Sequence, residues 1–203
     1  MKIICIGHNY PAHTKEMNAA VPAEPVFFLK PDTSLIRDNQ PFYYPTFSKE
    51  IHHEVELVLK INKAGKNIQT QFANKYYDEI GIGIDFTARD LQAECKKKGL
   101  PWEKAKAFDG AAPIGNFINK KQFADVNNIN FHLAVNGSIV QKGNSKDLQF
   151  SFDAIIAHVS IFFTLKTGDL IFTGTPVGVG PVNIGDKLEA YIEEQKLLDF
   201  EVK

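Results

Sequence analysis

Residues 51–59 read IHHEVELVL, and from Glu54 to Asn62 the chain carries its clearest strand pattern. Alternate side chains of a strand face the same way, so Glu54 and Glu56 project together from one surface. This surface is either the wet face of an amphipathic strand or one face of a strand buried on both sides, as in a sheet covered on two faces. Val58 lies on the face of the acids, and Val55, Leu57 and Leu59 form the other, which favours burial.

The two acids need a positive partner if they are buried. Burying an unpaired carboxylate is costly, and two neighbouring carboxylates repel each other. We therefore expect a divalent metal between them. His52 shares their face and is open to three interpretations, namely a ligand, a group behind the ligands or a residue at the strand end.

Strand and turn patterns recur along the rest of the chain. Further strands are predicted at residues 2–7, 26–31, 80–86, 130–135, 138–142, 170–173, 186–193 and 196–202, with a hairpin turn at Asn136-Gly137. Helices are predicted at residues 71–78, 87–98 and 152–163, and a short one begins near Pro11. We find no repeat or linker, and the sequence predicts one β-rich α+β domain over residues 1–203.

Composition excludes several classes of protein. Apolar residues make up 44% and charged residues 23% of the 203 residues, as in ordinary globular proteins, and the net charge of −1 does not suggest a nucleic-acid partner. No apolar run approaches the roughly 20 residues that span a membrane. Cys5 and Cys95 have no CxxC spacing, which argues against a disulfide framework or a zinc site. Because no presequence precedes the first predicted strand, we expect a cytoplasmic protein.

A third acid follows the strand at residues 80–86. Asp85 ends the apolar run in GIGIDFTARD, just before the helix predicted from Thr87, so an N-cap is one interpretation. The other interpretation joins Asp85 to Glu54 and Glu56 as a metal ligand. A site made only of carboxylates selects hard cations, so the metal would be Mg²⁺ or Mn²⁺.

Two further motifs could carry chemistry. His13 and Glu16 are three residues apart, so a helical turn places them on one face, where the carboxylate would orient the imidazole as a general base. A solvated surface pair is the alternative. The glycine-rich stretch at residues 172–181, FTGTPVGVGP, lacks the GK[ST] ending of a phosphate loop. It is either a turn between strands or a pocket wall that binds a substrate carboxylate.

Five stretches together resemble the fumarylacetoacetate hydrolase superfamily, in particular its short members, which are acylpyruvases and oxaloacetate decarboxylases. The stretches are GHNYPAHTKEM, EPVFFLKP, HHEVEL, GIDFTARDLQAECKKKGLPWEKAKAFDGAAP and TGTPVGVGPV, and they run over nearly the whole chain. The resemblance implies a mixed β-sandwich roll with peripheral helices, and a homodimer. Larger relatives carry an additional N-terminal domain and a fourth metal-binding acid, both absent here.

The resemblance also implies roles for individual residues. It makes Glu54, Glu56 and Asp85 the metal ligands, and His13 with Glu16 a catalytic dyad on a mobile lid within residues 1–20. Lys106 would reach the bound substrate, Arg89 and Gln92 would line the site, and Thr175 would contact the substrate carboxylate. Asp90, Glu94 and the run at residues 96–98 are expected on a solvated helix face.

The implied activity is hydrolytic cleavage of the C–C bond of 3-acylpyruvates, dependent on Mg²⁺ or Mn²⁺ and passing through a metal-bound pyruvate enolate. Decarboxylation of oxaloacetate and isomerisation or tautomerisation of 2-oxo dicarboxylic acids are the alternatives on the same scaffold. A non-catalytic module that binds a metal–dicarboxylate complex is the alternative of another class, and the complete set of acids, dyad and lysine argues against it. No nucleic-acid or membrane partner is expected.

Overall fold

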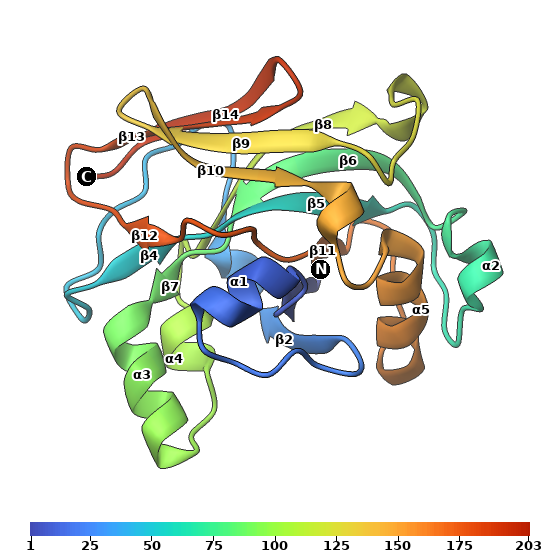
Figure 1. The fold of residues 1–203 in the computed structure, drawn as a ribbon, viewed down its shortest axis with the longest axis horizontal. Coiled ribbons are helices and arrows are strands. Elements are labelled where there is room, and N and C mark those ends of the chain that lie inside the picture. The colour runs from blue at the N-terminus through green and yellow to red at the C-terminus, as the bar shows by residue number, and fades with distance from the viewer.

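The computed structural model describes all 203 residues as a strand-rich fold of curled sheets with helices at the periphery (Figure 1). The largest sheet is mixed, because β1 runs parallel to β11 and β3 parallel to β8, whereas the other neighbours are antiparallel. Its order is β2 (Val26–Lys30), β1 (Ile3–Gly7), β11 (Leu170–Phe172), β5 (Val55–Ile61), β6 (Tyr77–Ile84), β8 (Ala112–Asn119) and β3 (Leu35–Ile36).

Two smaller sheets complete the strand framework. The four-stranded sheet has the order β10 (Ser138–Asn144), β9 (Asn130–Val135), β13 (Lys187–Ile192) and β14 (Gln195–Glu201). The three-stranded sheet has the order β12 (Gly180–Pro181), β4 (Ile51–His53) and β7 (Thr87–Ala88). The four-stranded sheet covers one face of β5, β6 and β8, and this pair of sheets forms the predicted mixed sandwich.

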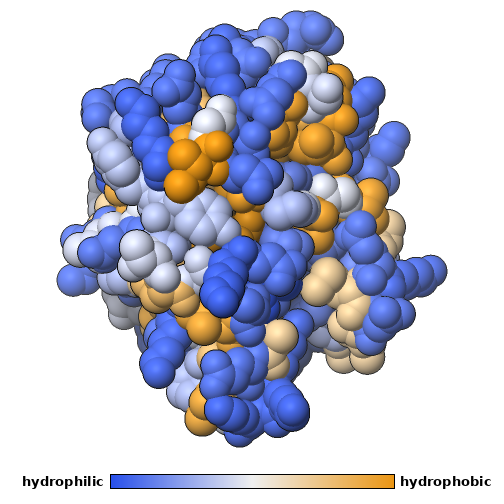
Figure 2. Space-filling model, turned by 90° about the vertical axis from the view of Figure 1, so that its left-hand side faces the viewer, coloured by the Kyte–Doolittle hydropathy of each residue, from blue (hydrophilic) through white to orange (hydrophobic).

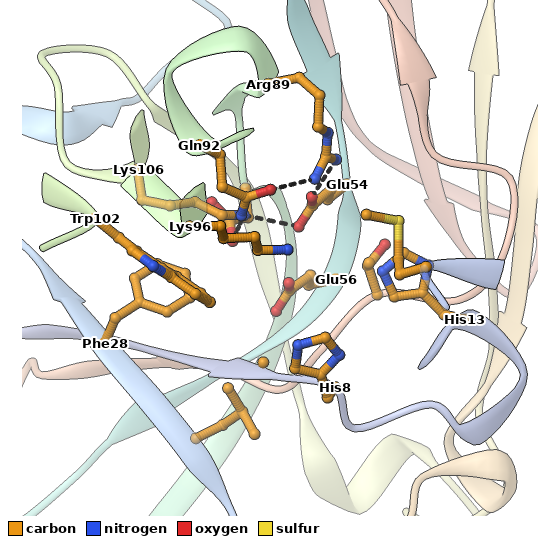
Figure 3. Close-up of a pocket in the computed structure, with 15 residues that line it drawn as sticks. His8, His13, Phe28, Glu54, Glu56, Arg89, Gln92, Lys96, Trp102 and Lys106 are labelled. Atoms are coloured by element: carbon orange, nitrogen blue, oxygen red, sulfur yellow. Dashed lines mark hydrogen bonds and ion pairs between the residues drawn. The ribbon is translucent and has the colours of Figure 1, made fainter. Parts of the chain in front are cut away.

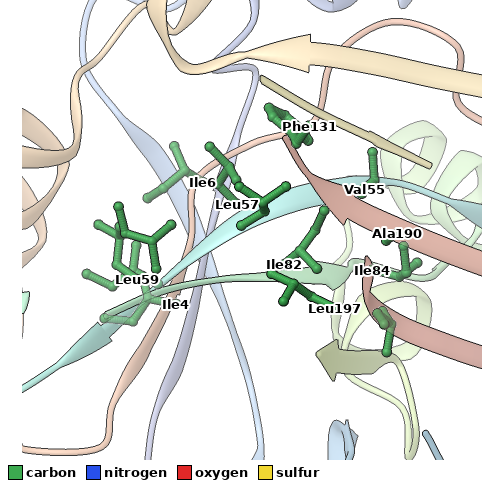
Figure 4. Close-up of a cluster of buried hydrophobic side chains, with 14 of the residues drawn as sticks. Ile4, Ile6, Val55, Leu57, Leu59, Ile82, Ile84, Phe131, Ala190 and Leu197 are labelled. Atoms are coloured by element: carbon green, nitrogen blue, oxygen red, sulfur yellow. The ribbon is translucent and has the colours of Figure 1, made fainter. Parts of the chain in front are cut away.

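The main core fills the space between these two sheets (Figure 4). From β5 it takes Val55, Leu57 and Leu59, which face Ile82 and Ile84 of β6 and side chains of the four-stranded sheet, among them Phe131, Ala190 and Leu197. Val58 points the opposite way, into a smaller cluster with Cys5 and Phe172. The strand is thus buried on both faces, so the wet-face interpretation of the acids is wrong.

Five helices lie outside the sheets. They are α1 (Pro11–Glu16), α2 (Thr70–Ala73), α3 (Arg89–Lys98), α4 (Glu103–Lys106) and α5 (Phe152–Phe162). Figure 1 shows α1, α3 and α4 grouped beside β2 and β7, while α5 packs against α2 at the other end. No helix is long and apolar enough to cross a membrane.

The predicted strands are largely confirmed, and two helix predictions need correction. Residues 71–78 were expected to be helical, but the helix ends at Ala73 because Tyr77 already pairs with Ile61 at the start of β6. The helix predicted from Thr87 begins at Arg89, since Thr87 pairs with His52 as part of β7. Gly99 ends α3 in the left-handed conformation, as predicted.

Seen from the side at the left of Figure 1, the surface carries apolar side chains in several separate patches among hydrophilic ones (Figure 2). Scattered apolar exposure of this kind is normal for a globular protein.

A substitution at Gly83 can test the packing behind the acids. It pairs with Glu56 across the ladder, and a Cβ at this glycine would lie 2.7 Å from the ring of Phe172 and 3.0 Å from the carbonyl oxygen of Pro113. We expect Gly83→Ala to lower the free energy of unfolding by about 1–3 kcal/mol, because this site has no room for a methyl group. Urea denaturation measures it, with Gly7→Ala, where the nearest atom is 3.9 Å away, as the control.

Candidate metal and substrate site

Three carboxylates converge where β5 begins and β6 ends. Val55 pairs with Ile84 in the antiparallel ladder, and the N–H of Asp85 donates to the carbonyl oxygen of Glu54 at 2.8 Å. Glu54 and Asp85 are therefore direct neighbours across the ladder, and Glu56 follows two residues further along β5. One oxygen from each of Glu54, Glu56 and Asp85 lies within 4.8 Å of the other two, and all three side chains are buried.

Cations surround two of the acids. The Lys106 ammonium lies 2.8 Å from an oxygen of Glu54 and 2.8 Å from Asp85, and the Arg89 guanidinium lies 2.7 Å from the other Glu54 oxygen. Burial alone favours a neutral Glu54, but Lys106 and Arg89 hold its pKa well below the usual range. Burial opposes the charge of Lys106 as well, yet Asp85 and Glu54 raise its pKa. Glu54 and Lys106 therefore stay ionised at neutral pH.

Glu56 differs from its two neighbours. It has no cationic partner, and its one hydrogen bond is accepted from the N–H of Gly174 at 2.7 Å. Burial, followed by the negative charge of Asp85, raises its pKa well above the ordinary value. An ionised Glu56 would thus have no cationic partner among the side chains. The three carboxylates offer only oxygen ligands, and such a set fits a hard divalent cation. The residues present therefore fit Mg²⁺ or Mn²⁺.

The predicted dyad forms at the edge of the pocket. Pro11 begins α1, and this short helix places His13 Nδ1 2.8 Å from a carboxylate oxygen of Glu16. The other Glu16 oxygen accepts the N–H of Gly178 at 3.2 Å, which ties α1 to the glycine-rich stretch. His13 is buried although its helix is peripheral, whereas the Glu16 side chain is 37% exposed, so the pair lies at the boundary between the pocket and solvent.

One pocket contains both the acids and the imidazole (Figure 3). It has a side with Phe28 and Trp102 and an opposite side with His13, and Glu54 and Glu56 lie between them. Its lining comprises Ile6, Gly7, His8, His13, Met17, Phe28, Glu54, Glu56, Asp85, Arg89, Gln92, Lys96, Trp102, Lys106 and Thr175. Of the predicted site residues, all except Glu16 line this pocket.

The remaining predicted residues occupy defined positions. Arg89 donates to the side-chain oxygen of Gln92 at 2.7 Å, so these two act as one unit on α3. His52 lies behind Arg89, whose Nε donates to it at 3.4 Å, and it does not line the pocket. The N-cap interpretation of Asp85 is wrong, because Ala88 occupies that position of α3.

Sequence reasoning missed two buried residues that hold the site in place. Gln141 donates to the Thr175 hydroxyl at 2.9 Å and accepts from the N–H of Val55 at 3.0 Å, so it fixes the glycine-rich stretch against β5. Lys30 lies 2.7 Å from Asp85 and also donates to the carbonyl oxygens of Phe86, Lys106 and Ala111. A lysine at the end of an apolar strand was the available signal for Lys30, and Gln141 gave none.

The run at residues 96–98 is exposed, as predicted, and Lys96 in addition lines the pocket mouth. Its position follows from helix geometry, because residue 96 is four residues after Gln92 and seven after Arg89 and therefore shares their face.

Lys30 provides a test of this arrangement. We expect Lys30→Met to lower the free energy of unfolding by about 3–5 kcal/mol, because it leaves the buried Asp85 carboxylate without one of its partners. Lys60→Met is the matched control, since it removes the exposed ion pair of 2.7 Å with Glu79 at the far end of β5 and β6, which is worth about 1 kcal/mol or less. Equal losses in urea denaturation would contradict the structural role of Lys30.

Comparison with known proteins agrees with this geometry. The family described as fumarylacetoacetate (FAA) hydrolase C-terminal matches residues 2–203. The chain belongs to the fumarylacetoacetate hydrolase family. Oxaloacetate tautomerase YcgM of Escherichia coli K12 is 43% identical over 97% of this chain and 90% of its own length. The mitochondrial oxaloacetate tautomerase FAHD1 of Mus musculus is 43% identical over 99% of this chain and 91% of its own length.

A solved structure in the fumarylacetoacetate hydrolase family is also close. The fumarylpyruvate hydrolase of Pseudomonas aeruginosa, in complex with Mn²⁺ and pyruvate, superposes with a TM-score of 0.94 at 35% identity, covering 100% of this chain and 89% of that one. These three relatives are thus named for enzymatic activities on 2-oxo acids.

Proposed function

We propose that this chain is an oxaloacetate keto–enol tautomerase that depends on Mg²⁺ or Mn²⁺. The observation that carries the proposal is the position of His13, held by Glu16, in the same pocket as the three buried carboxylates. Relatives named as oxaloacetate tautomerases, 43% identical over nearly the whole chain, support the choice of reaction.

The proposed metal ligands are Glu54, Glu56 and Asp85. A divalent cation held there would supply a Lewis acid for the 2-oxo group and the adjacent carboxylate of the substrate. The missing positive partner of Glu56 supports this assignment. A relative of 35% identity was crystallised with Mn²⁺ and pyruvate, which supports both the metal and the substrate class.

His13 is the proposed acid–base group. Its Nδ1–H donates to Glu16, so Nε2 keeps its lone pair and can take a proton from C3 of oxaloacetate. The C3–H electron pair then forms the C2–C3 double bond while the carbonyl pair moves to the C2 oxygen, and the proton held by His13 is delivered to that oxygen, which completes the enol and restores the imidazole. Negative charge develops on that oxygen in between, and the Lys106 ammonium stabilises it in a site that excludes most water. The reverse sequence returns the ketone.

Hydrolysis of acylpyruvates, such as fumarylpyruvate, is the second candidate. In this reaction His13 would take the proton from an attacking water, and the C–C bond would break to release the enolate of pyruvate and an acid. The observation that favours it is the likeness to a fumarylpyruvate hydrolase bound to pyruvate. Decarboxylation of oxaloacetate needs no attacking water and would depend much less on His13.

We also propose that α1 is a lid, that the chain is a cytoplasmic homodimer and that residues 1–203 form one catalytic domain. The lid proposal is supported by the small size of α1, six residues, and by the single contact of 3.2 Å through which Glu16 holds the glycine-rich stretch. A lid of this kind would open for substrate and close to exclude water.

The experiment compares the three reactions on one preparation. Enolic oxaloacetate is added to the Mg²⁺- or Mn²⁺-loaded protein, and loss of the enol absorbance is followed alongside release of pyruvate and cleavage of fumarylpyruvate and acetylpyruvate. We expect ketonisation to have the largest kcat/KM. Faster cleavage of acylpyruvates would favour the hydrolase, and binding without turnover of any compound would favour a non-catalytic module.

A further inference from the structure

Five basic side chains line the pocket, and they fall into two groups. His13 is held by Glu16, and Arg89 and Lys106 are held by Glu54, so these three already have a carboxylate partner. His8 and Lys96 have none, although both line the same pocket. The Lys96 ammonium lies 5.5 Å from the centre of the Trp102 ring and makes no ion pair.

His8 is held in an unusual conformation. Its φ of 57° is in the left-handed region, which few residues other than glycine adopt, although asparagine, aspartate and histidine tolerate it best. The half-buried ring projects into the pocket beside Glu56, and its Nδ1 is buried without a hydrogen-bond partner (Figure 3). Because Nδ1 has no accessible surface, a ligand in the pocket can meet the His8 ring only at its other atoms, among them Nε2.

Lys96 lies in α3. It shares the face of Arg89 and Gln92, so the helix that holds Glu54 also carries a lysine at the pocket mouth. The next residues on the helix are different, because Lys97 does not line the pocket and Lys98 pairs with Glu94 at 2.5 Å. Burial and then the positive charge of Lys96 lower the pKa of His8.

We infer that His8 and Lys96 form the subsite for the second, distal carboxylate of the substrate, and that Lys96 makes the site selective for 2-oxo dicarboxylates over 2-oxo monocarboxylates. This inference rests on the proposed function of the same site. In this arrangement, the carboxylate next to the 2-oxo group lies near Thr175 and the cation that the three acids would hold. The C4 carboxylate of oxaloacetate then lies against His8 and Lys96. Phe28 and Trp102 form the aromatic wall beside them.

The test uses two compounds that differ only in the distal charge, oxaloacetate and its C4 methyl ester. For Lys96→Met we expect the ratio of kcat/KM for oxaloacetate to kcat/KM for the ester to fall about ten-fold, through a higher KM for oxaloacetate, since a charge-assisted hydrogen bond is lost. Lys97→Met is the matched control on the same helix and keeps the wild-type ratio. His8→Gly, which retains the left-handed backbone, lowers the ratio in the same direction.

Inhibition by oxalate provides a second measurement. Oxalate resembles the 2-oxo acid end of the substrate and has no distal carboxylate, so its inhibition constant stays within about two-fold of wild type in Lys96→Met. An unchanged kcat/KM ratio, or equal losses on oxaloacetate and ester, would overturn the inference while leaving the tautomerase intact.

Failure of the proposed function gives a different result. If wild type turns over neither compound, the tautomerase proposal fails, and the subsite is then decided by calorimetry on the Mn²⁺-loaded protein. Tighter binding of oxaloacetate than of the ester, reduced in Lys96→Met, supports the subsite. Equal affinities in wild type overturn it.

Discussion

We expect His13→Asn to lower kcat for the proposed ketonisation of oxaloacetate by about 10²- to 10⁴-fold, the usual contribution of a positioned acid–base group. Asparagine fits the same buried volume but cannot take up the C3 proton. Because the three carboxylates lie on other elements, we expect the variant to retain the wild-type affinity for Mn²⁺. Stopped-flow measurement of the enol absorbance and a calorimetric titration give the two values.

His132→Asn controls for loss of an imidazole elsewhere, since this ring stacks on Tyr191 in the four-stranded sheet, outside the pocket. Glu16→Gln, which keeps the hydrogen bond but removes the charge, loses less activity than His13→Asn. A His13→Asn enzyme with undiminished ketonisation would show that the dyad has no part in proton transfer.

Glu56→Gln has the second large effect. We expect kcat/KM to fall about 10³-fold or more, because several kcal/mol of Lewis-acid stabilisation are lost with the metal. The exposed substitution Glu79→Gln on the adjacent strand leaves kcat/KM unchanged. Retention of activity in Glu56→Gln would remove this residue from the ligand set.

Although Glu56→Gln lowers activity, we expect it to raise the stability of the metal-free protein. Burial and Asp85 raise the folded-state pKa of Glu56, so the folded protein takes up a proton on this group more readily than the unfolded chain does. Stability therefore falls as pH rises above the unfolded pKa towards the folded one. Metal-free Glu56→Gln is thus more stable than wild type near pH 7, and the difference shrinks as pH falls towards about 4.5. Urea denaturation in chelator at several pH values measures it.

The sequence pattern predicts the positions of some site residues and not of others. The alternation predicted that Glu54 and Glu56 share one face, but the pattern left Asp85 open between an N-cap and a metal ligand, and only the family resemblance joined it to them. The antiparallel pairing of β5 with β6 places Asp85 beside Glu54. The exact break between β4 and β5 at Glu54 was not predicted. It arises from long-range pairing, since β4 joins β7 and β12 whereas β5 joins β6 and β11.

Residues positioned only by tertiary contacts were missed. Lys30 reaches Asp85 from a strand 55 positions earlier in the chain, and no periodicity links them. Gln141 likewise acts on Thr175 and β5 from a hairpin whose strands were predicted but whose inward side chains were not. Lys96 was predictable, because its spacing from Arg89 and Gln92 places it on the site face of α3. His8 was not, since its left-handed backbone has no sequence signature here.

The most direct test of the proposed metal site is a calorimetric titration of Mn²⁺ into protein dialysed exhaustively against chelator, with turnover measured on the same samples. We predict one Mn²⁺ per chain, no detectable binding in Glu56→Gln, and activity that is absent after dialysis and restored in proportion to the metal bound. Full ketonisation by the dialysed protein, or equal Mn²⁺ affinity in wild type and Glu56→Gln, would contradict it.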